Sequence, residues 1–150
     1  MSNLKRILVA TDFSPASGQA IEEGIALARA LGAELTVLHA WFAPMWAMPD
    51  GGMVAPDGET VAQLSRWSKE ELDRVRVRCV AAGVAVQTRN VEGPPADAIA
   101  RVADEEHFDL VVVGTHGRTG MRHFLLGSVA EHVIRTCKVP VMTVHSAPVL

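Results

Sequence analysis

The stretch VVVGTHGR, residues 111–118, carries the pattern that decides the fold. An apolar β-branched run stops at Gly114, and a second glycine follows three residues later at Gly117. Nine residues then separate Gly117 from the pair Gly127-Ser128, which opens a helix-like segment. A buried strand that ends in a glycine loop, before a helix whose free N–H groups face that loop, favours an anion such as phosphate. The pattern predicts an α/β fold with an anion-binding loop after a strand.

Strand-like and helix-like segments alternate along the chain in both directions from this stretch. Strand-like runs occur at residues 7–10, 35–38, 84–91, 109–113 and 139–144, with amphipathic helical segments between them. Residues 84–91 alternate like a strand with one less-buried face, whereas the other runs are mostly apolar. Ser14-Pro15 is typical of the start of the first of these helices, and Gly32 of its end. We therefore predict one α/β domain over residues 1–150, with a mostly parallel five-stranded sheet and helices on both faces.

A candidate ligand crevice follows from one common strand order, 3-2-1-4-5. In that order strands one and four are neighbours whose connections leave in opposite directions, and ligands bind where this happens. Asp12 follows strand one and Gly114 follows strand four, so both are expected to line the crevice. Asp12 could accept hydrogen bonds from a ribose or a base; the plain alternative is a turn aspartate that leads into a helix. Basic side chains also gather in the loop after Gly114: His116, Arg118, Arg122 and His123.

Composition narrows the class of protein. The formal charge of −3 and the pI near 6.0 argue against nucleic acid as a general partner. Cys79 and Cys137 have no zinc-like spacing and are expected to be reduced, and the six histidines show no metal-binding spacing. No window approaches the ~20 apolar residues that a membrane span needs, and no signal peptide is evident. We expect a cytoplasmic protein with no membrane span.

The glycine pattern differs from two common phosphate-binding motifs and resembles a third. The loop has no GxxxxGK[ST] sequence, and it does not follow strand one as GxGxxG would. The spacing Gly114-x2-Gly117-x9-Gly127-Ser128 resembles the ATP-binding signature of the universal stress protein family. Supporting segments also match that family across essentially the whole chain: residues 7–14 (ILVATDFS), 37–40 (VLHA), 91–94 (VEGP) and 140–144 (PVMTV).

This resemblance implies a Rossmann-like fold of the adenine nucleotide alpha hydrolase type, with the 3-2-1-4-5 sheet, and the nucleotide-binding branch of the family. It places the adenosine half of a nucleotide at Asp12 and the backbone of Ala40, with Thr11 at the same mouth of the site. It also implies that the ribose and phosphates contact Gly114, His116, Gly117 and Arg118. The remaining phosphate contacts that it implies are Gly127, Ser128 and Val129. For Ser128 the plain alternative is an ordinary N-cap, and for Arg118 a solvated loop charge.

The resemblance implies an adenine-nucleotide-binding regulatory protein of the stress response, with ATP or AMP as ligand. Magnesium could arrive with the nucleotide, although the sequence has no dedicated set of ligands for it. The loop has no lysine, no carboxylate and no water-positioning glutamine, so we expect at most weak ATPase activity. The alternatives are a slow ATP hydrolase and a dimeric interaction protein that binds no nucleotide. The downstream partner protein is unknown.

Two segments outside the glycine loop invite interpretation. Residues 41–53 hold two of the three tryptophans and three of the six methionines. We favour an irregular flap packed over its own core; the alternatives are a lid at the nucleotide mouth and an adaptable partner surface.

The last strand, from Val139 to Val144, is apolar and lies at a sheet edge in the expected order. Antiparallel pairing with its own copy would give a homodimer, which the resemblance also implies; the alternative is a monomer whose tail, residues 146–150, covers the edge.

Overall fold

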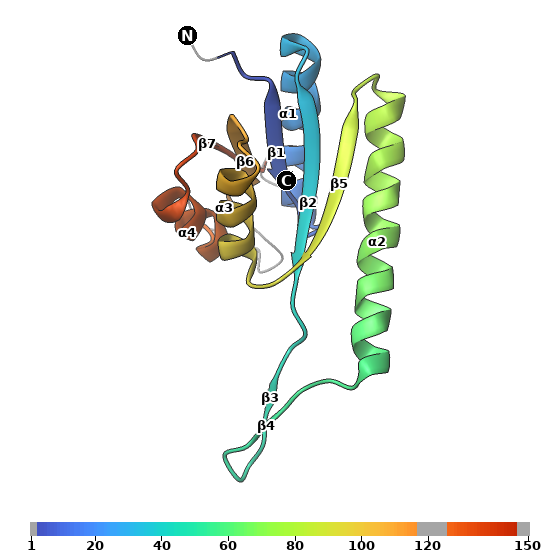
Figure 1. The fold of residues 1–150 in the computed structure, drawn as a ribbon, viewed down its shortest axis with the longest axis vertical. Coiled ribbons are helices and arrows are strands. Elements are labelled where there is room, and N and C mark those ends of the chain that lie inside the picture. The colour runs from blue at the N-terminus through green and yellow to red at the C-terminus, as the bar shows by residue number, and fades with distance from the viewer. Residues whose placement is uncertain (1–2, 117–125, 147–150) are drawn as a thin grey trace.

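The computed structural model describes residues 3–116 and 126–146. Figure 1 shows one sheet with helices on both sides and a narrow projection at one end. The elements are, in chain order, β1 (Arg6–Ala10), α1 (Pro15–Leu31), β2 (Glu34–Trp41), β3 (Trp46–Ala47), β4 (Met53–Val54), α2 (Gly58–Ala81), β5 (Val86–Glu92), α3 (Pro95–Glu105), β6 (Leu110–Gly114), α4 (Ser128–Thr136) and β7 (Val141–Val144).

The main sheet confirms the expected architecture. Its five strands run in the order β5-β2-β1-β6-β7, and every neighbouring pair is parallel. This is the predicted 3-2-1-4-5 order, with β7 at one edge. The chain leaves β1 toward β2 and leaves β6 toward β7, so the crevice at the carboxyl ends of β1 and β6 is a switch point between opposite windings.

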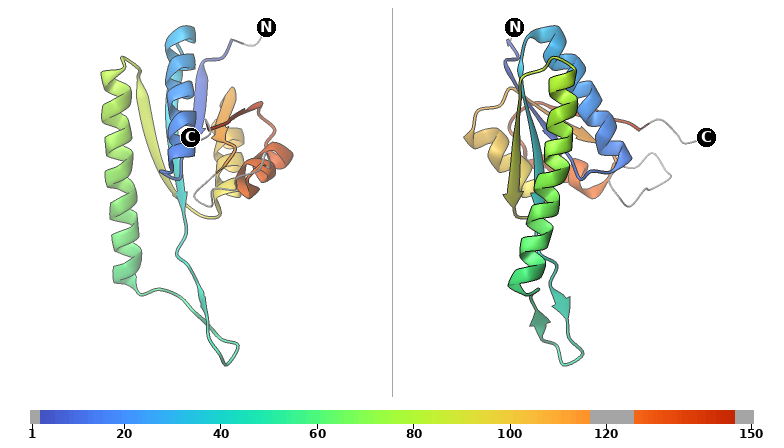
Figure 2. Two further views of the ribbon diagram at one scale, coloured as in Figure 1. Left: turned by 180° about the vertical axis from the view of Figure 1, so that it is seen from behind. Right: turned by 90° about the vertical axis from the view of Figure 1, so that its right-hand side faces the viewer.

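Two apolar layers hold the helices on the sheet, because alternate strand residues point to opposite faces. Ile7 and Val9 of β1 pack with α1 and α2, whereas Leu8 packs with α3 and α4. In the right-hand view of Figure 2, α1 and α3 lie on opposite sides of the sheet. No helix in the described ranges is both long enough and apolar enough to cross a membrane.

Helix α1 begins and ends where the sequence predicts. The Ser14 hydroxyl accepts a hydrogen bond from the Ser17 amide at 3.3 Å, and Pro15 follows as the first helical residue. At the other end Gly32 adopts a φ of 64°, the left-handed conformation that commonly ends helices. Between these ends, a Cβ at Gly24 would lie 2.4 Å from Val9 Cγ2, so this glycine lets α1 approach the sheet closely.

The conformation of residues 41–53 differs from the flap that we expected. β2 extends to Trp41, and the chain then forms a short antiparallel hairpin in which Trp46 pairs with Val54 and Ala47 with Met53. This hairpin projects away from the sheet instead of packing over the core (Figures 1 and 2). The expectation of a flap over its own core was therefore wrong. We call residues 42–56 the arm.

Candidate functional site

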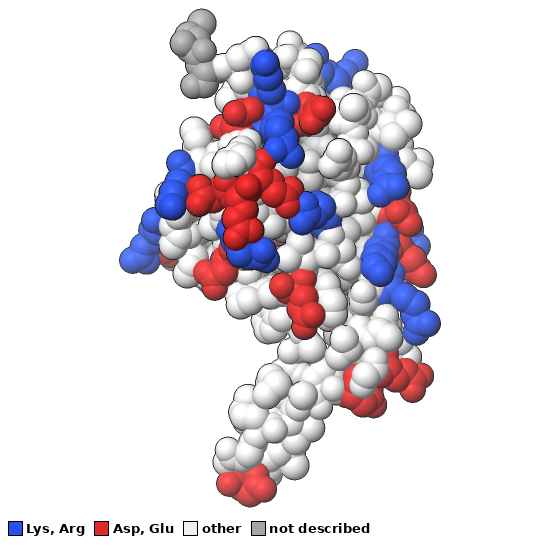
Figure 3. Space-filling view, viewed as in Figure 1, with Lys and Arg blue, Asp and Glu red and all other residues white. Residues whose placement is uncertain are grey.

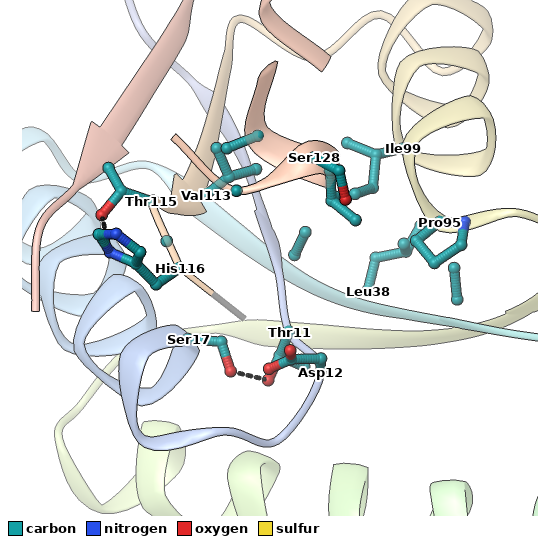
Figure 4. Close-up of a pocket in the computed structure, with 16 residues that line it drawn as sticks. Thr11, Asp12, Ser17, Leu38, Pro95, Ile99, Val113, Thr115, His116 and Ser128 are labelled. Carbon is teal, nitrogen blue, oxygen red and sulfur yellow. Dashed lines mark hydrogen bonds between the residues drawn. The ribbon is translucent and has the colours of Figure 1, made fainter. Parts of the chain in front are cut away.

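A cavity of about 270 Å³ lies at the switch point, at the carboxyl ends of β1, β2 and β6. Its inner wall is apolar and is formed by Ala10, Leu38, Ile99, Val113 and Ala130. Its polar rim comes from the turn after β1, the residues after β6 and the first turn of α4 (Figure 4). An apolar slot with polar groups at one side suits a ligand with a flat, weakly polar ring and a charged end.

Most of the residues selected from the sequence lie around this one cavity. The lining includes Thr11, Asp12, Ala40, Gly114, His116, Gly127, Ser128 and Val129. Gly117 and Arg118 lie outside the described residues, as do Arg122 and His123. Sequence reasoning assigned no role to Ser17, Pro95 or Thr115, which also line the cavity. Thr115 directly follows the glycine that ends β6, and this position in the sequence could have identified it as a cavity residue.

The turn after β1 is held by hydroxyl and carboxylate groups. Asp12 Oδ1 accepts a hydrogen bond from the Ser14 amide at 2.9 Å, which makes Asp12 a turn aspartate as well as a cavity residue. Thr11 Oγ1 lies 3.0 Å from Ser17 Oγ and accepts a hydrogen bond from the Phe13 amide at 3.0 Å. Asp12 therefore sits on a tightly defined turn, and a substitution there affects both the turn and the cavity.

The same turn packs against an aromatic cluster that the sequence did not predict. Phe13 has a φ of 63°, an uncommon conformation for a residue with a bulky side chain. Its ring lies 4.4 Å from the His39 ring and 5.4 Å from the Trp67 ring, measured between centroids. His39 Nδ1 lies 2.8 Å from the Thr11 carbonyl oxygen. The cluster therefore connects β2 and α2 to the turn that carries Asp12.

The backbone of Ala40 faces the crevice because β1 is shorter than β2. The Leu38 carbonyl accepts a hydrogen bond from the Thr11 amide at 2.9 Å, so the polar groups of Leu38 point toward β1. Alternate residues of a strand present their backbone groups to the same side, which directs those of Ala40 toward β1 as well. At that level the chain has already turned toward α1. The Ala40 backbone can therefore meet a ligand in the cavity.

Gly114 has a structural reason to lack a side chain. A Cβ at this position would lie 3.2 Å from the Ala16 carbonyl oxygen and 3.3 Å from its carbon. The first turn of α1 thus packs directly against the end of β6. Beyond it, Thr115 is buried, and its hydroxyl lies 3.0 Å from His116 Nδ1.

Helix α4 begins at the cavity with Gly127 as its N-cap. Ser128 is the first helical residue, so the interpretation of Ser128 as an ordinary N-cap was wrong. Gly127 has no side chain, and no side-chain hydrogen bond caps this end of α4 among the described residues. Ser128, Val129 and Ala130 of the first turn line the cavity. Their N–H groups and the positive end of the helix dipole favour an anion at this point.

The described residues contain no group of three histidine, cysteine, aspartate or glutamate side chains that could hold a metal ion. Asp12 is the acidic side chain in the cavity lining. One carboxylate suits contact with hydroxyl groups or with a cation that arrives with its own ligands.

A doubly wound parallel sheet with an apolar crevice and a helix N-terminus at its switch point defines a class of Rossmann-like α/β proteins. Within that class, the chain belongs to the universal stress protein family, whose model, described as "Universal stress protein family", matches residues 3–145.

Individual relatives agree with this assignment. Universal stress protein MJ0531 of Methanocaldococcus jannaschii is 34% identical over 142 residues, which cover 93% of this chain and 81% of that protein. The solved structure of MJ0577, a universal stress protein of the same organism, matches with a TM-score of 0.82 at 25% identity and covers 99% of this chain and 100% of that chain. A universal stress protein solved in complex with cAMP matches with a TM-score of 0.67 at 31% identity, covering 96% of this chain and 98% of that chain.

Proposed function

We propose that this chain binds an adenine nucleotide, ATP or AMP, in the crevice and acts as a nucleotide-sensing regulatory protein of the stress response. The observation that carries the proposal is the division of one cavity into an apolar slot and the N-terminus of α4, where glycine is the N-cap. The slot suits adenine, and the first turn of α4 suits phosphate. The relative in complex with cAMP supports the same ligand class.

The proposed contacts follow from the geometry. Adenine lies in the slot between Leu38 and Ile99, with hydrogen bonds to the Ala40 backbone. Thr11 and Asp12 meet the ribose hydroxyls, and the N–H groups of the first turn of α4 meet the phosphates. Gly117 and Arg118 remain predicted phosphate contacts. Magnesium enters the proposal only as a companion of the nucleotide.

Isothermal titration with ATP, ADP, AMP and cAMP tests the proposal, each with and without magnesium. We expect saturable heat for at least one adenylate and none for adenine-free phosphates. The purified protein is also denatured and its extract separated by chromatography, which identifies any adenylate that it retained. The absence of heat with every adenylate at millimolar concentration, together with an extract free of nucleotide, contradicts the proposal.

Asp12→Asn separates the ligand role of this side chain from its turn role. Asparagine keeps an oxygen for the Ser14 amide but replaces the charged acceptor that we assign to the ribose. We expect affinity for AMP to fall about 10- to 100-fold, because a hydrogen bond to a charged group contributes about 1.5–3 kcal/mol. The melting temperature should stay close to that of the wild type. A variant that binds AMP as tightly as the wild type would leave Asp12 with the turn role alone.

We also propose that two copies associate through β7, as the sequence resemblance implies. The Pro140 and Val144 carbonyls accept hydrogen bonds from the amides of Val111 in β6 and of Thr115 just after it. The alternate amides of Val141 and Thr143 therefore point away from the sheet. Edge amides of this kind can pair with a second copy about a two-fold axis. Of the tail that could cover this edge instead, residues 147–150 lie outside the described ranges.

Thr143→Pro tests this association because proline removes an outward N–H and leaves the bonds to β6 in place. We expect the mass measured by light scattering to halve, while Thr143→Val keeps the wild-type mass. A proline variant with unchanged mass and a normal melting curve would exclude pairing through β7.

A further inference from the structure

The arm exposes an unusually apolar surface. Its large apolar side chains are 44–58% exposed: Phe42, Met45, Trp46, Met48, Met53 and Val54. Within the described part of the chain, none of them belongs to either core cluster, and none lines the cavity. Contiguous exposed apolar surface of this kind marks an interaction site in a folded protein.

The hairpin in the arm is too short to stand alone. Two residue pairs join β3 to β4, and a two-stranded hairpin in water is marginal even when it is longer. Pro44 and Pro56 lie two residues outside the ladder and leave room for one further pair at most. Burial of its side chains against another surface is therefore the source of stability that this hairpin requires.

The charge of the arm restricts the partner. Asp50, at the tip, is the one charged residue between positions 42 and 56, and the arm contains no lysine or arginine. Figure 3 shows the projection as an uncharged surface with acidic atoms at its end. Anionic membranes and nucleic acids attract basic segments, so neither suits the arm. The partner surface is apolar, with positive charge where Asp50 lands.

The first turns of α2 provide such a surface. Val61 and Leu64 are half-buried and continue the inner face of α2 beyond Ser68, the first fully buried residue of that helix. Among the described residues, neither Val61 nor Leu64 belongs to a core cluster. Arg66 and Lys69 are exposed on the same part of α2, and neither forms an ion pair with a residue of the described ranges.

We propose that the arm of one copy lies along the first turns of α2 of a second copy, about a two-fold axis that returns the same contact. The tip lies nine residues after Trp41, so it can reach at most about 30 Å from the sheet at ~3.3 Å per residue. Arg66 and Lys69 lie about 14–18 Å along α2 from Asp57 at 1.5 Å per residue. Each arm is therefore long enough to pass the base of its partner's arm and bring Asp50 to these cations.

This interface is separate from the one proposed at β7. Helix α2 packs beside β5, at the opposite edge of the sheet from β7. The arm does not line the cavity, so its variants should bind nucleotide as the wild type does. Failure of the arm interface and failure of nucleotide binding are thus measured independently.

Sedimentation of the full chain over a range of concentrations tests the apolar contact. We expect Trp46→Ser combined with Met53→Ser to weaken one association step at least about thirtyfold and to halve the mass at moderate concentration. The matched control is Val77→Ser combined with Val80→Ser, which removes exposed apolar side chains elsewhere on α2 and should keep the wild-type mass. An arm variant that sediments as the wild type overturns the proposal.

Charge reversal tests whether the occupant is a second copy. Asp50→Lys alone, and Arg66→Asp combined with Lys69→Asp, should each raise the dissociation constant about tenfold. An equimolar mixture of the two variants restores opposite charges at both contacts of the two-fold pair and should recover wild-type association. The proposal is overturned if the mixture associates as weakly as each variant alone. It is also overturned if the wild-type protein shows no association that depends on the arm and floats with phosphatidylcholine vesicles.

Discussion

Ser128→Asp is expected to weaken ATP binding at least tenfold while leaving the protein as stable as before or slightly more so. Ser128 is the first residue of α4 and lines the cavity beside the proposed phosphate position. A carboxylate in the first turn of a helix is favoured by the helix dipole by about 0.3–1 kcal/mol. The same carboxylate repels phosphate, and two unit charges 4 Å apart at a partly exposed site repel each other by up to about 4 kcal/mol.

Stability and affinity should therefore move in opposite directions, which a merely damaged protein would not show. Titration calorimetry measures the affinity, and thermal unfolding without ligand measures the stability. Ser128→Asn is the matched control, because asparagine has nearly the shape of aspartate without the charge. Adenosine, which has no phosphate, should bind both variants equally. Equal ATP affinity in the Asp and Asn variants would place the phosphates away from α4.

Gly24→Ala is expected to lower the free energy of unfolding by about 1–3 kcal/mol, although alanine is the better helix former. The new methyl group would meet Val9 Cγ2 at 2.4 Å and Leu35 Cδ1 at 3.4 Å. Both side chains are fully buried in the sheet, so α1 must move outward to accept it. Urea unfolding monitored by circular dichroism measures the difference.

Gly18→Ala is the control within the same helix. A Cβ at Gly18 would meet nothing within 4 Å, so this substitution should stabilise the protein by about 0.5–1 kcal/mol. Opposite signs at two glycines of one helix can arise only from packing against the sheet. Destabilisation of equal size at both positions would contradict the close approach of α1 to Val9.

The strand order and α4 were predictable because each depends on local patterns that packing does not oppose. Apolar runs separated by amphipathic segments leave few parallel topologies, and α4 begins at the Gly127-Ser128 pair, where a helix is expected. The cap of α4 was not predictable in the same way. A serine hydroxyl is the usual cap, and the sequence does not reveal that the glycine before it takes that position.

The position of the arm was wrongly predicted, because composition indicates that a segment contacts an apolar surface but not where the segment lies relative to its own core. Tryptophan and methionine in residues 41–53 indicate contact with something apolar, and the simplest candidate is the protein's own core. The extension of β2 to Trp41 carries the chain past the end of the core before the hairpin forms.

Most of the candidate site was predictable, because neighbouring parallel strands end at the same edge of a sheet. Eight of the ten selected site residues line one cavity. The nucleotide contacts of all ten remain predictions.

The cluster of Phe13, His39 and Trp67 gives the protein a native optical probe. Trp67 touches the ring that props the Asp12 turn, and it belongs to the helix that the arm leads into. Indole emission responds to movement of nearby rings and to protonation of a neighbouring imidazole. Once Trp41 and Trp46 are replaced by phenylalanine, the fluorescence of one side chain follows events at the crevice without any attached dye.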